Sequence, residues 1–412
     1  MSKTAPLPRG RRPKPKISDR DVQGGRMLAR IMEILAPLHD HCPDPKRNLH
    51  YDEHCAWILL YFFTPVLDSV RGLQQASDIE PIRRRFGLPR FSLGSFSEAG
   101  NVFDPQLLAA IIEDVGECLE DIETDPRLTG LQKRPTPVDG TLIRALPKMV
   151  WALWCDEEHR AAKLHLQFDI LKAAPVRATL THGQASEIEE LRKNLQPGRL
   201  YIDDRGYFDF ALMEATLRAG SSFVTRVREN IVYETVEERP IGQTDTPGRV
   251  QSDLLVRAGG RQHGEVHDRT LRLVRIHVPD AGSSRRGPAR LDSKTQSYRT
   301  AEPSHTLVLL TDLLDMDVSL VALLYYYRWQ IELFFRWFKK VLEADHLLSL
   351  SENGLTIVLY CALIASMLVT LWTGRKPTKR TYELLCFYFL GLVNDEDLLV
   401  RLEHLEHHQQ PR

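Results

Sequence analysis

The sequence of 412 residues has few cysteines and no paired-cysteine motif. Without a C-x-x-C pair, the six cysteines fit neither a zinc site nor a disulfide framework, and they predict a reducing cytoplasmic environment. They are Cys42, Cys55, Cys118, Cys155, Cys361 and Cys386. An excess of charge is also absent, because the formal net charge is −1. This excludes a protein that coats nucleic acid over its whole surface, so any DNA contact must come from local basic patches.

Hydrophobic runs long enough to cross a membrane are scarce. We expect no secretory signal, because the first apolar run follows a long segment rich in proline and basic residues. One run, LTIVLYCALIASMLVTLW at 355–372, has eighteen residues without a formal charge, which is the lower edge for a membrane span. A buried helix is favoured over a span, because Thr, Ser, Cys and Tyr interrupt the run and no second span accompanies it. The sequence therefore predicts no membrane partner.

Metalloprotease spacing and internal repeats are also missing. His159, His165 and His182 form neither H-x-x-x-H nor H-E-x-x-H, so a metalloprotease has little support. The length leaves room for two or three domains.

The two ends of the chain differ in composition from its middle. Residues 1–26 are rich in proline and basic residues and are expected to form a basic flexible arm. Its PRGRRPKPK segment is similar to arms that lie in A·T-rich minor grooves, and a generic basic tail is the alternative. Helical periodicity dominates 27–130, which predicts a helical domain. Residues 373–412 are expected to form a helical C-terminal tail.

The middle of the chain mixes strands and helices. In 131–227, three strand-like runs precede a helix, a strand, a helix and a strand, which predicts a mixed sheet flanked by helices. Residues 228–305 contain no convincing helix and predict a β-rich insertion. Residues 306–372 begin within the strand-like run SHTLVLLTDLL and continue as helix. The fold class predicted is therefore α/β with a helical N-terminal domain.

An apolar segment at 323–340, LLYYYRWQIELFFRWFKK, carries polar residues at helical spacing. Five of them fall within roughly 40° of Glu332 on a helix that advances about 100° per residue. They are Tyr325, Arg328, Glu332, Arg336 and Lys339. The adjacent stripe is apolar and can pack against a core; it consists of Leu324, Ile331, Phe335, Phe338 and Leu342.

Two interpretations of this helix face are open. It is either a chain of i,i+4 ion pairs on a solvated surface, or a metal-binding carboxylate surrounded by cations that bind phosphate. The flanking Trp329 and Trp337 favour the second interpretation, because they predict a face that is only partly solvated. Such a face suits phosphoryl transfer on a polyanion.

Further carboxylates stand at strand ends beside glycine. Asp139 lies in TPVDGTLIRAL, and Asp203 and Asp204 lie in LYIDDRGYFDF, where a strand runs into a tight turn. Taken singly, each is typical of a turn or a helix N-cap. Together with Glu332, they supply the ligands with which a pair of divalent cations bridges the attacking and leaving oxygens of one phosphodiester.

The sequence resembles the DDE-type transposases of bacterial insertion sequences, specifically the insertion-sequence-four (IS-four) family. That family carries a Tyr-Arg-Glu-Lys signature, which falls here on Tyr325, Arg328, Glu332 and Lys339 with the family's spacing. VDGT at Asp139 is similar to the first acidic motif and DRGY at Asp204 to the second, so Asp204 is preferred to Asp203. The match runs from Asp139 to about residue 372, with the β-rich insertion between the second and third motifs.

The resemblance implies an RNase H-like core formed by 131–227 and 306–372 and interrupted by 228–305. It implies two Mg²⁺ ions, with Mn²⁺ as a substitute, held by Asp139, Asp204 and Glu332. It also implies that Tyr325, Arg328 and Lys339 bind DNA phosphate, and Arg336 joins them because it shares their helix face.

The resemblance also implies the partners. They are double-stranded DNA, as the terminal inverted repeats of the element and as target DNA, and a second copy of the chain in a DNA-bound homodimer. The arm and 27–130 are expected to supply end-sequence binding in the bacterial cytoplasm, close to the nucleoid. No Trp occurs between Trp154 and Trp329, so a hairpin intermediate is not implied.

Three functions remain open from the sequence. The first is a transposase that cleaves element ends and joins them to target DNA. The second is a nuclease on the same fold that hydrolyses without joining. The third is a DNA-binding protein without catalysis, against which the intact Asp139, Asp204 and Glu332 argue.

Overall fold

The computed structural model describes residues 31–41, 47–123, 125–154, 159–242, 248–259, 268–279, 304–344 and 346–407. The predicted arm, 1–26, lies outside these residues. The chain forms two compact units, one made of Met1–Phe96 with Glu383–Arg412 and the other of Ser97–Tyr382. All candidate site residues belong to the second unit.

The first unit is built from helices. Its elements are η2 (Ala36–Leu38), α2 (Tyr51–Phe63), α3 (Val70–Asp78), α4 (Glu80–Phe86) and α14 (Asp395–His407), and parts of α5 (Leu93–Val102) and α13 (Lys379–Phe389). Trp57 and Phe63 of α2 are fully buried. Phe63 stacks on Phe389, with ring centroids 5.1 Å apart, so the N-terminal and C-terminal parts of this unit share one core. The described part of 27–130 is largely helical, whereas the unit itself ends at Phe96 and includes Glu383–Arg412.

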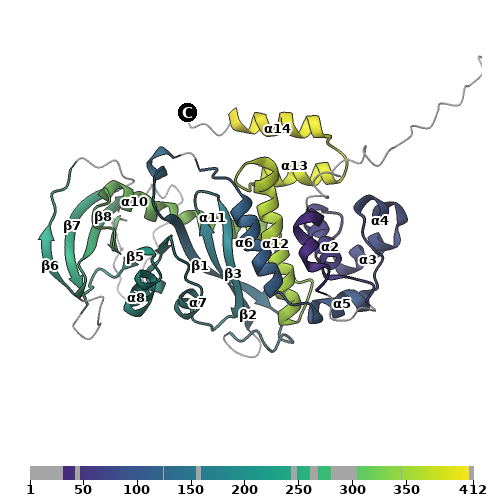
Figure 1. The fold of residues 1–412 in the computed structure, drawn as a ribbon, viewed down its shortest axis with the longest axis horizontal. Helices are drawn as coiled ribbons and strands as arrows, with labels where there is room; N and C mark the ends of the chain where they lie inside the picture. The colour runs from purple at the N-terminus through teal and green to yellow at the C-terminus, as the bar shows by residue number, and fades with distance from the viewer. Residues whose placement is uncertain are drawn as a thin grey trace, which may run out of the picture. The chain divides into compact units, whose positions relative to one another are not determined.

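The second unit contains a nine-stranded sheet in the order β3-β2-β1-β4-β5-β9-β8-β7-β6 (Figure 1). The strands are β1 (Arg134–Ala145), β2 (Arg160–Asp169), β3 (Ala174–His182), β4 (Arg199–Asp203), β5 (Ser222–Val227), β6 (Tyr233–Glu238), β7 (Arg249–Ala258), β8 (Leu271–Pro279) and β9 (Ser304–Thr311). β1 is parallel to β4 and β4 is parallel to β5, whereas the other neighbouring pairs are antiparallel. The mixed α/β sheet is therefore confirmed.

Helices cover both faces of this sheet. They are α6 (Gln106–Cys118), α7 (Glu187–Lys193), α8 (Phe210–Arg218), α10 (Val318–Tyr327), α11 (Trp329–Lys340) and α12 (Glu352–Thr373). Along β4, Leu200 and Ile202 join a core with α10, whereas Tyr201 joins a core with α7 and α8. Because successive side chains of a strand point to opposite faces, the sheet has an α10 face and an α7–α8 face.

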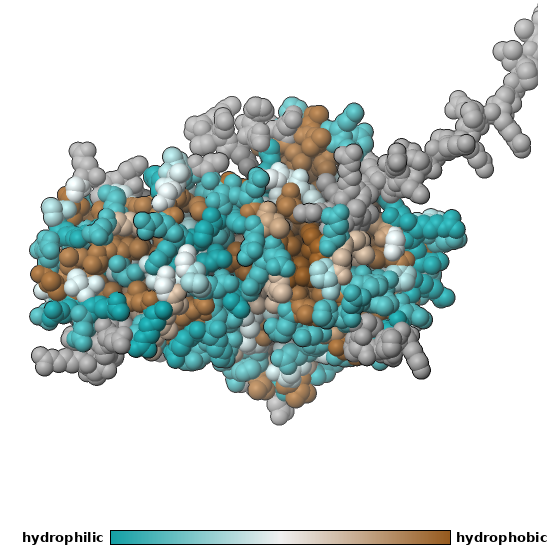
Figure 2. All heavy atoms as spheres, in the orientation of Figure 1, coloured by the Kyte–Doolittle hydropathy of each residue, from teal (hydrophilic) through white to brown (hydrophobic). Residues whose placement is uncertain are grey.

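The strands of 228–305 continue the same sheet. β9 pairs with β5 on one side and with β8 on the other, so β6, β7 and β8 extend the sheet instead of forming a second one. Most of the face seen in Figure 2 is hydrophilic, and hydrophobic side chains show over these strands. β6 is the edge strand, and its Val236 is exposed.

The predicted helix at 323–340 is divided in two. α10 ends at Tyr327 and α11 begins at Trp329. Between them, Arg328 keeps helical dihedral angles but donates its N–H to the carbonyl of Tyr325, three residues back, which tightens the backbone at this point. The prediction of one continuous helix was therefore wrong at Arg328. The apolar stripe is confirmed, because Leu324, Ile331, Phe335, Phe338 and Leu342 are all buried.

The long hydrophobic run forms α12. This helix has the length and composition of a membrane span, but 94% of its most apolar window is buried inside the structure. Its Tyr360 hydroxyl donates to the carbonyl oxygen of Ala178 on β3 at 3.0 Å, and its Met367 reaches Gly116 of α6. The burial of α12 in the second unit accounts for the hydrophobic run without a membrane.

Candidate active site

Asp139 lies where β1 changes its neighbours. β1 pairs with β4 from Arg134 to Pro137, whereas its pairing with β2 runs from Val138 to Ala145. Beyond Pro137, the edge of β1 that faced β4 therefore has no strand partner among the described residues. Asp139 is the second residue beyond the last pair with β4.

Two aspartates stand at the end of β4, directly after its last pair with β1. Asp203 is the last residue of β4, and Asp204 caps the short 3₁₀ helix Arg205–Tyr207 by accepting the N–H of Gly206 at 2.7 Å. Asp203 is only 3% exposed, and its Oδ1 has no hydrogen-bond partner among the described residues. Asp204 is partly exposed. Of the two, the aspartate of the DRGY motif is therefore the more accessible to solvent.

Arg328 forms an ion pair with Glu332 and packs on Tyr325. The Arg328 Nη2 lies 2.5 Å from Glu332 Oε1, and its guanidinium carbon lies 5.6 Å from the ring centroid of the buried Tyr325. Burial raises the pKa of Asp139, and the positive charge of Arg328 opposes this rise, while Asp204 helps to raise the pKa of Arg328. One cation therefore compensates carboxylates from β1, from the end of β4 and from α11.

The other two cations of the predicted face lie farther along α11. Lys339 Nζ donates to the carbonyl oxygen of Leu142 on β1 at 2.7 Å, three residues beyond Asp139. Arg336 is exposed. The structure thus brings Tyr325, Arg328 and Glu332 together, places Lys339 against the strand that carries Asp139, and leaves Arg336 at the surface.

The carboxylates do not form a ready-made metal cluster. Within the described residues, no group of three or more His, Cys, Asp or Glu side chains is placed so that it could hold a metal ion. The expectation that Asp139, Asp204 and Glu332 gather within reach of an ion pair is not met by these side-chain positions. The physical reason is that the carboxylate of Glu332 is turned toward Arg328 as its ion-pair partner.

The pKa of Asp139 is raised to about 6, first by burial and then by the negative charges of Asp204 and Glu187. The N–H of Gly140 and the charge of Arg328 oppose this shift. Between its ordinary pKa of 3.8 and about 6, the folded chain therefore holds a proton that the unfolded chain has released. Through this residue, the free energy of unfolding falls as the pH rises through that window.

We expect Asp139→Asn to remove this pH dependence. The melting temperature of the variant should rise relative to wild type as the pH increases from 4 to 7, because the buried carboxylate is no longer ionised. Thermal unfolding of both proteins across this range measures the difference. A constant difference in melting temperature at every pH would contradict the raised pKa.

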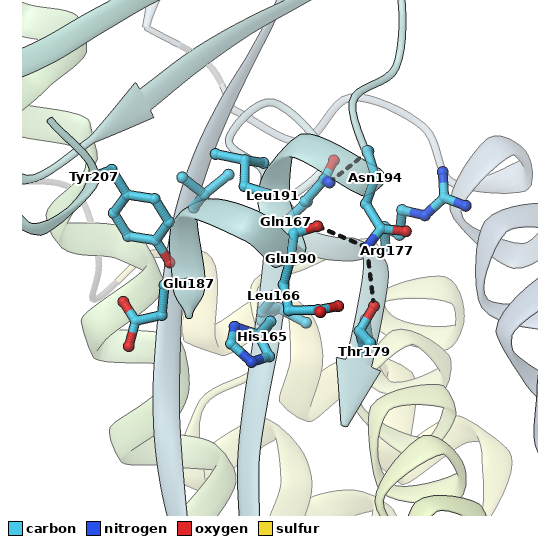
Figure 3. Close-up of a pocket in the computed structure, with 12 residues that line it drawn as sticks. His165, Leu166, Gln167, Arg177, Thr179, Glu187, Glu190, Leu191, Asn194 and Tyr207 are labelled. Carbon is cyan, nitrogen blue, oxygen red and sulfur yellow. Dashed lines mark hydrogen bonds between the residues drawn. The ribbon is translucent and has the colours of Figure 1, made fainter. Parts of the chain in front are cut away.

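The α7–α8 face adds residues that sequence reasoning missed. Glu187 is the first residue of α7. Tyr207 ends the short 3₁₀ helix that follows Asp204, and its side chain is buried, only 3% exposed. In Figure 3 the Tyr207 hydroxyl and the Glu187 carboxylate lie on the same side of a small pocket that His165 also lines. Burial, followed by the charges of Glu187, Asp139, Asp203 and Asp204, raises the pKa of Tyr207 well above its usual value. The DRGY motif contained the signal for Tyr207, whereas no spacing rule pointed to Glu187.

Comparisons with known proteins identify the family of the chain. A sequence model of the transposase DDE domain matches residues 130–368. The chain is 24% identical over 341 residues to a probable transposase for insertion sequence element IS5377 from Geobacillus stearothermophilus, covering 80% of this chain and 79% of that protein. It is 28% identical over 212 residues to the putative transposase y4zB from Sinorhizobium fredii, covering 51% and 53%.

Among solved structures, the chain is similar to the cryo-EM structure of a piggyBac transposase synaptic complex with hairpin DNA. The TM-score is 0.38 and the sequence identity 10%, with 95% of this chain and 86% of that chain covered. The matched family model spans more than half of the chain and includes Asp139, Asp204 and Glu332. The protein therefore belongs to the transposase DDE domain family and is a DDE transposase.

Proposed function

We propose that this DDE transposase is a member of the IS-four family that moves an insertion sequence. It binds the terminal inverted repeats of the element, cleaves the DNA at the element ends and joins those ends to target DNA. The observation that carries the proposal is the convergence on one cation, Arg328, of carboxylates from β1, from the end of β4 and from α11. Asp139 stands beyond the last residue of β1 that pairs with β4, close to the end of the strand that leads into Asp204.

Divalent metal dependence is implied by membership of the family, and the residues present fit such ions. The donor set consists of carboxylate oxygens, which hard cations such as Mg²⁺ prefer. The Oδ1 of buried Asp203, which has no hydrogen-bond partner among the described residues, is a further feature of a polar site. We propose that Asp139, Asp204 and Glu332 hold two Mg²⁺ ions, for which Mn²⁺ can substitute. When bound, such ions stabilise the attacking and leaving oxygens of an in-line displacement.

The side chains on α10 and α11 would position the DNA. Arg328 carries a planar guanidinium that suits a phosphate, and Lys339 offers a point charge on a flexible chain. Exchange of Glu332 for a DNA phosphate as the partner of Arg328 would release the carboxylate for metal binding. In this proposal Tyr325 and Arg336 complete the phosphate contacts.

The mixed sheet, with carboxylates on adjacent strands β1 and β4, supports an RNase H-like core formed by 131–227 and 306–372. We further propose that the arm at 1–26 and the helices of 27–130 bind the end sequences, and that two copies act together on a pair of ends. Phosphate neutralisation by the basic residues of these parts would supply much of the affinity. The protein would act in the cytoplasm.

A strand-transfer assay tests this function. The full-length chain is incubated in Mg²⁺ with a donor DNA that carries the two ends flanking its own gene, together with a target plasmid. We expect cleavage at the element ends and covalent joining of those ends to the target. Cleavage without joining would identify a nuclease, and binding with neither product would identify a DNA-binding protein without catalysis.

A further inference from the structure

Arg272 of β8 is buried on the sheet face that α10 covers. Only 3% of it is exposed, although arginine is seldom buried in a protein core. The preceding elements explain its direction, because Leu273 packs with Met213 of α8, whereas Val274 packs with α10, which lies next to β8 in Figure 1. Since side chains alternate along a strand, Arg272 points to the same face as Val274. A charged side chain therefore stands where an apolar one could fill the core.

Asp253 of β7 is the ion-pair partner of Arg272. The Arg272 Nε donates to Asp253 Oδ1 at 2.8 Å, and its Nη2 donates to Asp253 Oδ2 at 2.6 Å. Asp253 is only 4% exposed, so the pair is buried as a whole. Such a pair is weak evidence for a role in stability, because apolar residues of similar volume often stabilise a core equally well. The two bonds also leave Nη1 of Arg272 for other acceptors.

Those acceptors lie in the loop 312–317, which joins β9 to α10. The Arg272 Nη1 donates to the carbonyl oxygens of Leu313 at 3.2 Å and Leu314 at 3.4 Å, and also to that of Met316. An apolar side chain at position 272 could fill the same space, but it would leave these carbonyl groups without their donor. The guanidinium thus supplies a contact with the loop that core packing cannot replace.

Arg239 makes a second contact of the same kind. It follows directly after β6, and its backbone N–H donates to the carbonyl oxygen of Asp253 at 2.9 Å. Its Nη1 donates to the carbonyl oxygen of Leu314. Two arginines from the β-rich segment 228–305 therefore hold one loop of the part of the chain that follows it.

The loop determines where α10 begins. At its start, Asp312 accepts the N–H of Phe223 of β5 at 2.9 Å, and at its end, Asp317 caps α10 by accepting the N–H of Ser319 at 2.8 Å. Between these ends, the loop lines an open pocket of about 600 Å³. Packing contacts are lost along the wall of a pocket, so packing alone does not fix this part of the loop. The hydrogen bonds to the arginines take on that task.

We propose that Arg272, held by Asp253, is a positioning residue for the DNA reaction. By fixing the loop before α10, it sets the position of α10 and of Arg328 and Glu332, which follow this helix in the chain. This rests on the proposed function, because it assumes that Arg328 and Glu332 act at the element end. The strands β7 and β8 would thus have a part in the reaction that does not require them to touch DNA.

The competing explanation is that Arg272 and Asp253 only stabilise the fold. The double variant Arg272→Met with Asp253→Leu separates the two, because apolar residues replace the buried pair while the loop carbonyls lose their donor. We expect a melting temperature close to wild type and a rate of end cleavage, at saturating protein, that is lower by about 10-fold or more, since small misplacements of reacting groups are costly. The affinity for end DNA should change less than the rate.

Two single variants complete the test. Arg272→Lys keeps a charge beside Asp253, but an ammonium lacks the planar guanidinium that bonds the carboxylate and the loop at once. We expect it to fold and to cleave more slowly than wild type, and a wild-type rate would overturn the proposal even if the double variant did not fold. The matched control is Arg275→Met on the same strand, where the guanidinium carbon lies 5.9 Å from the ring centroid of Tyr233; its rate should be that of wild type, and a loss equal to that of Arg272→Lys would contradict a specific role of Arg272.

Hydrogen exchange of backbone amides distinguishes failure of this inference from failure of the proposed function. We expect faster exchange in 312–317 and in the first turn of α10 in the double variant. Wild-type exchange there would overturn the role of Arg272 in fixing the loop. Faster exchange with a wild-type rate of cleavage would overturn the positioning role and leave the proposed function standing. Absence of end cleavage by the wild-type chain would overturn the proposed function, and this inference with it.

Discussion

Replacement of Asp139, Asp204 or Glu332 by the corresponding amide is expected to abolish metal-dependent cleavage of element ends. Each amide keeps the size of the side chain and removes one ligand charge, so the pair of cations can no longer be held at the scissile phosphate. Cleavage of end-containing DNA in Mg²⁺ measures the effect. Wild-type rates in any of the three variants would contradict the assignment of that residue.

DNA binding by the same variants is the control. Phosphate contacts from basic residues dominate affinity, so Asp139→Asn, Asp204→Asn and Glu332→Gln should still retard end-containing DNA in a gel. Loss of binding and cleavage together would indicate that the variant had lost its fold. Thermal unfolding distinguishes that outcome from a specific defect in chemistry.

Comparison of Asp203→Asn with Asp204→Asn tests which of these two neighbouring aspartates is the second acidic residue of the site. The native Asp203 lies next to Asp204 but is buried. Burial is the chief cause that raises its pKa to about 8, so much of this carboxyl is protonated at neutral pH. Asp204 is partly exposed at the end of the same strand. We therefore expect a larger loss of cleavage from Asp204→Asn than from Asp203→Asn, and the reverse order would move the second acidic position to Asp203.

The elements of the second unit followed from local sequence patterns. Runs of apolar and β-branched residues predicted β1 to β5, and a 3.6-residue period predicted the buried stripe of α10 and α11, because burial of one face imposes these periods on a sequence. The motif spacing also grouped Tyr325, Arg328 and Glu332 correctly, since they lie within two turns of each other.

The missed features depend on contacts between distant segments. Glu187 reaches Gly140 only because α7 packs across β1, and Lys339 meets Leu142 only because α11 crosses the same strand. The continuation of the sheet through β9 likewise depends on strand order, which no local pattern encodes. The break at Arg328 is a local feature, but it arises from a three-residue hydrogen bond that helical periodicity does not distinguish from a regular turn.

Arg328→Ala and Lys339→Ala are expected to lower end-complex formation or cleavage by about 10-fold or more. A charge-assisted contact to phosphate contributes roughly 1.5–3 kcal/mol, which corresponds to such a loss. The matched control is Lys340→Ala, which removes the same charge from the exposed neighbour of Lys339. It should leave end binding and cleavage close to wild type.

The alternative role of these cations is structural, and stability measurements distinguish it. If Arg328 and Lys339 served only as surface ion-pair partners, the removal of either would lower the free energy of unfolding by less than about 1 kcal/mol. DNA cleavage and joining would then be unchanged. The side chain of Arg328 is only 14% exposed and pairs with Glu332, so its removal also takes away that ion-pair partner. Arg328→Lys restores that charge but not the planar guanidinium, and we expect it to recover stability more than end binding.

Tyr325→Phe tests the phosphate-binding role of the same helix face by removing a single hydroxyl group. The ring stays in place beneath Arg328, where it lies 5.6 Å from the guanidinium carbon, and only the buried hydroxyl is removed. If that hydroxyl binds a phosphate oxygen at the element end, cleavage should fall while the melting temperature stays the same. Normal cleavage by Arg328→Ala, Lys339→Ala and Tyr325→Phe would overturn the phosphate-binding role of this helix face, and would leave Arg328 as a counter-ion for the carboxylates around it.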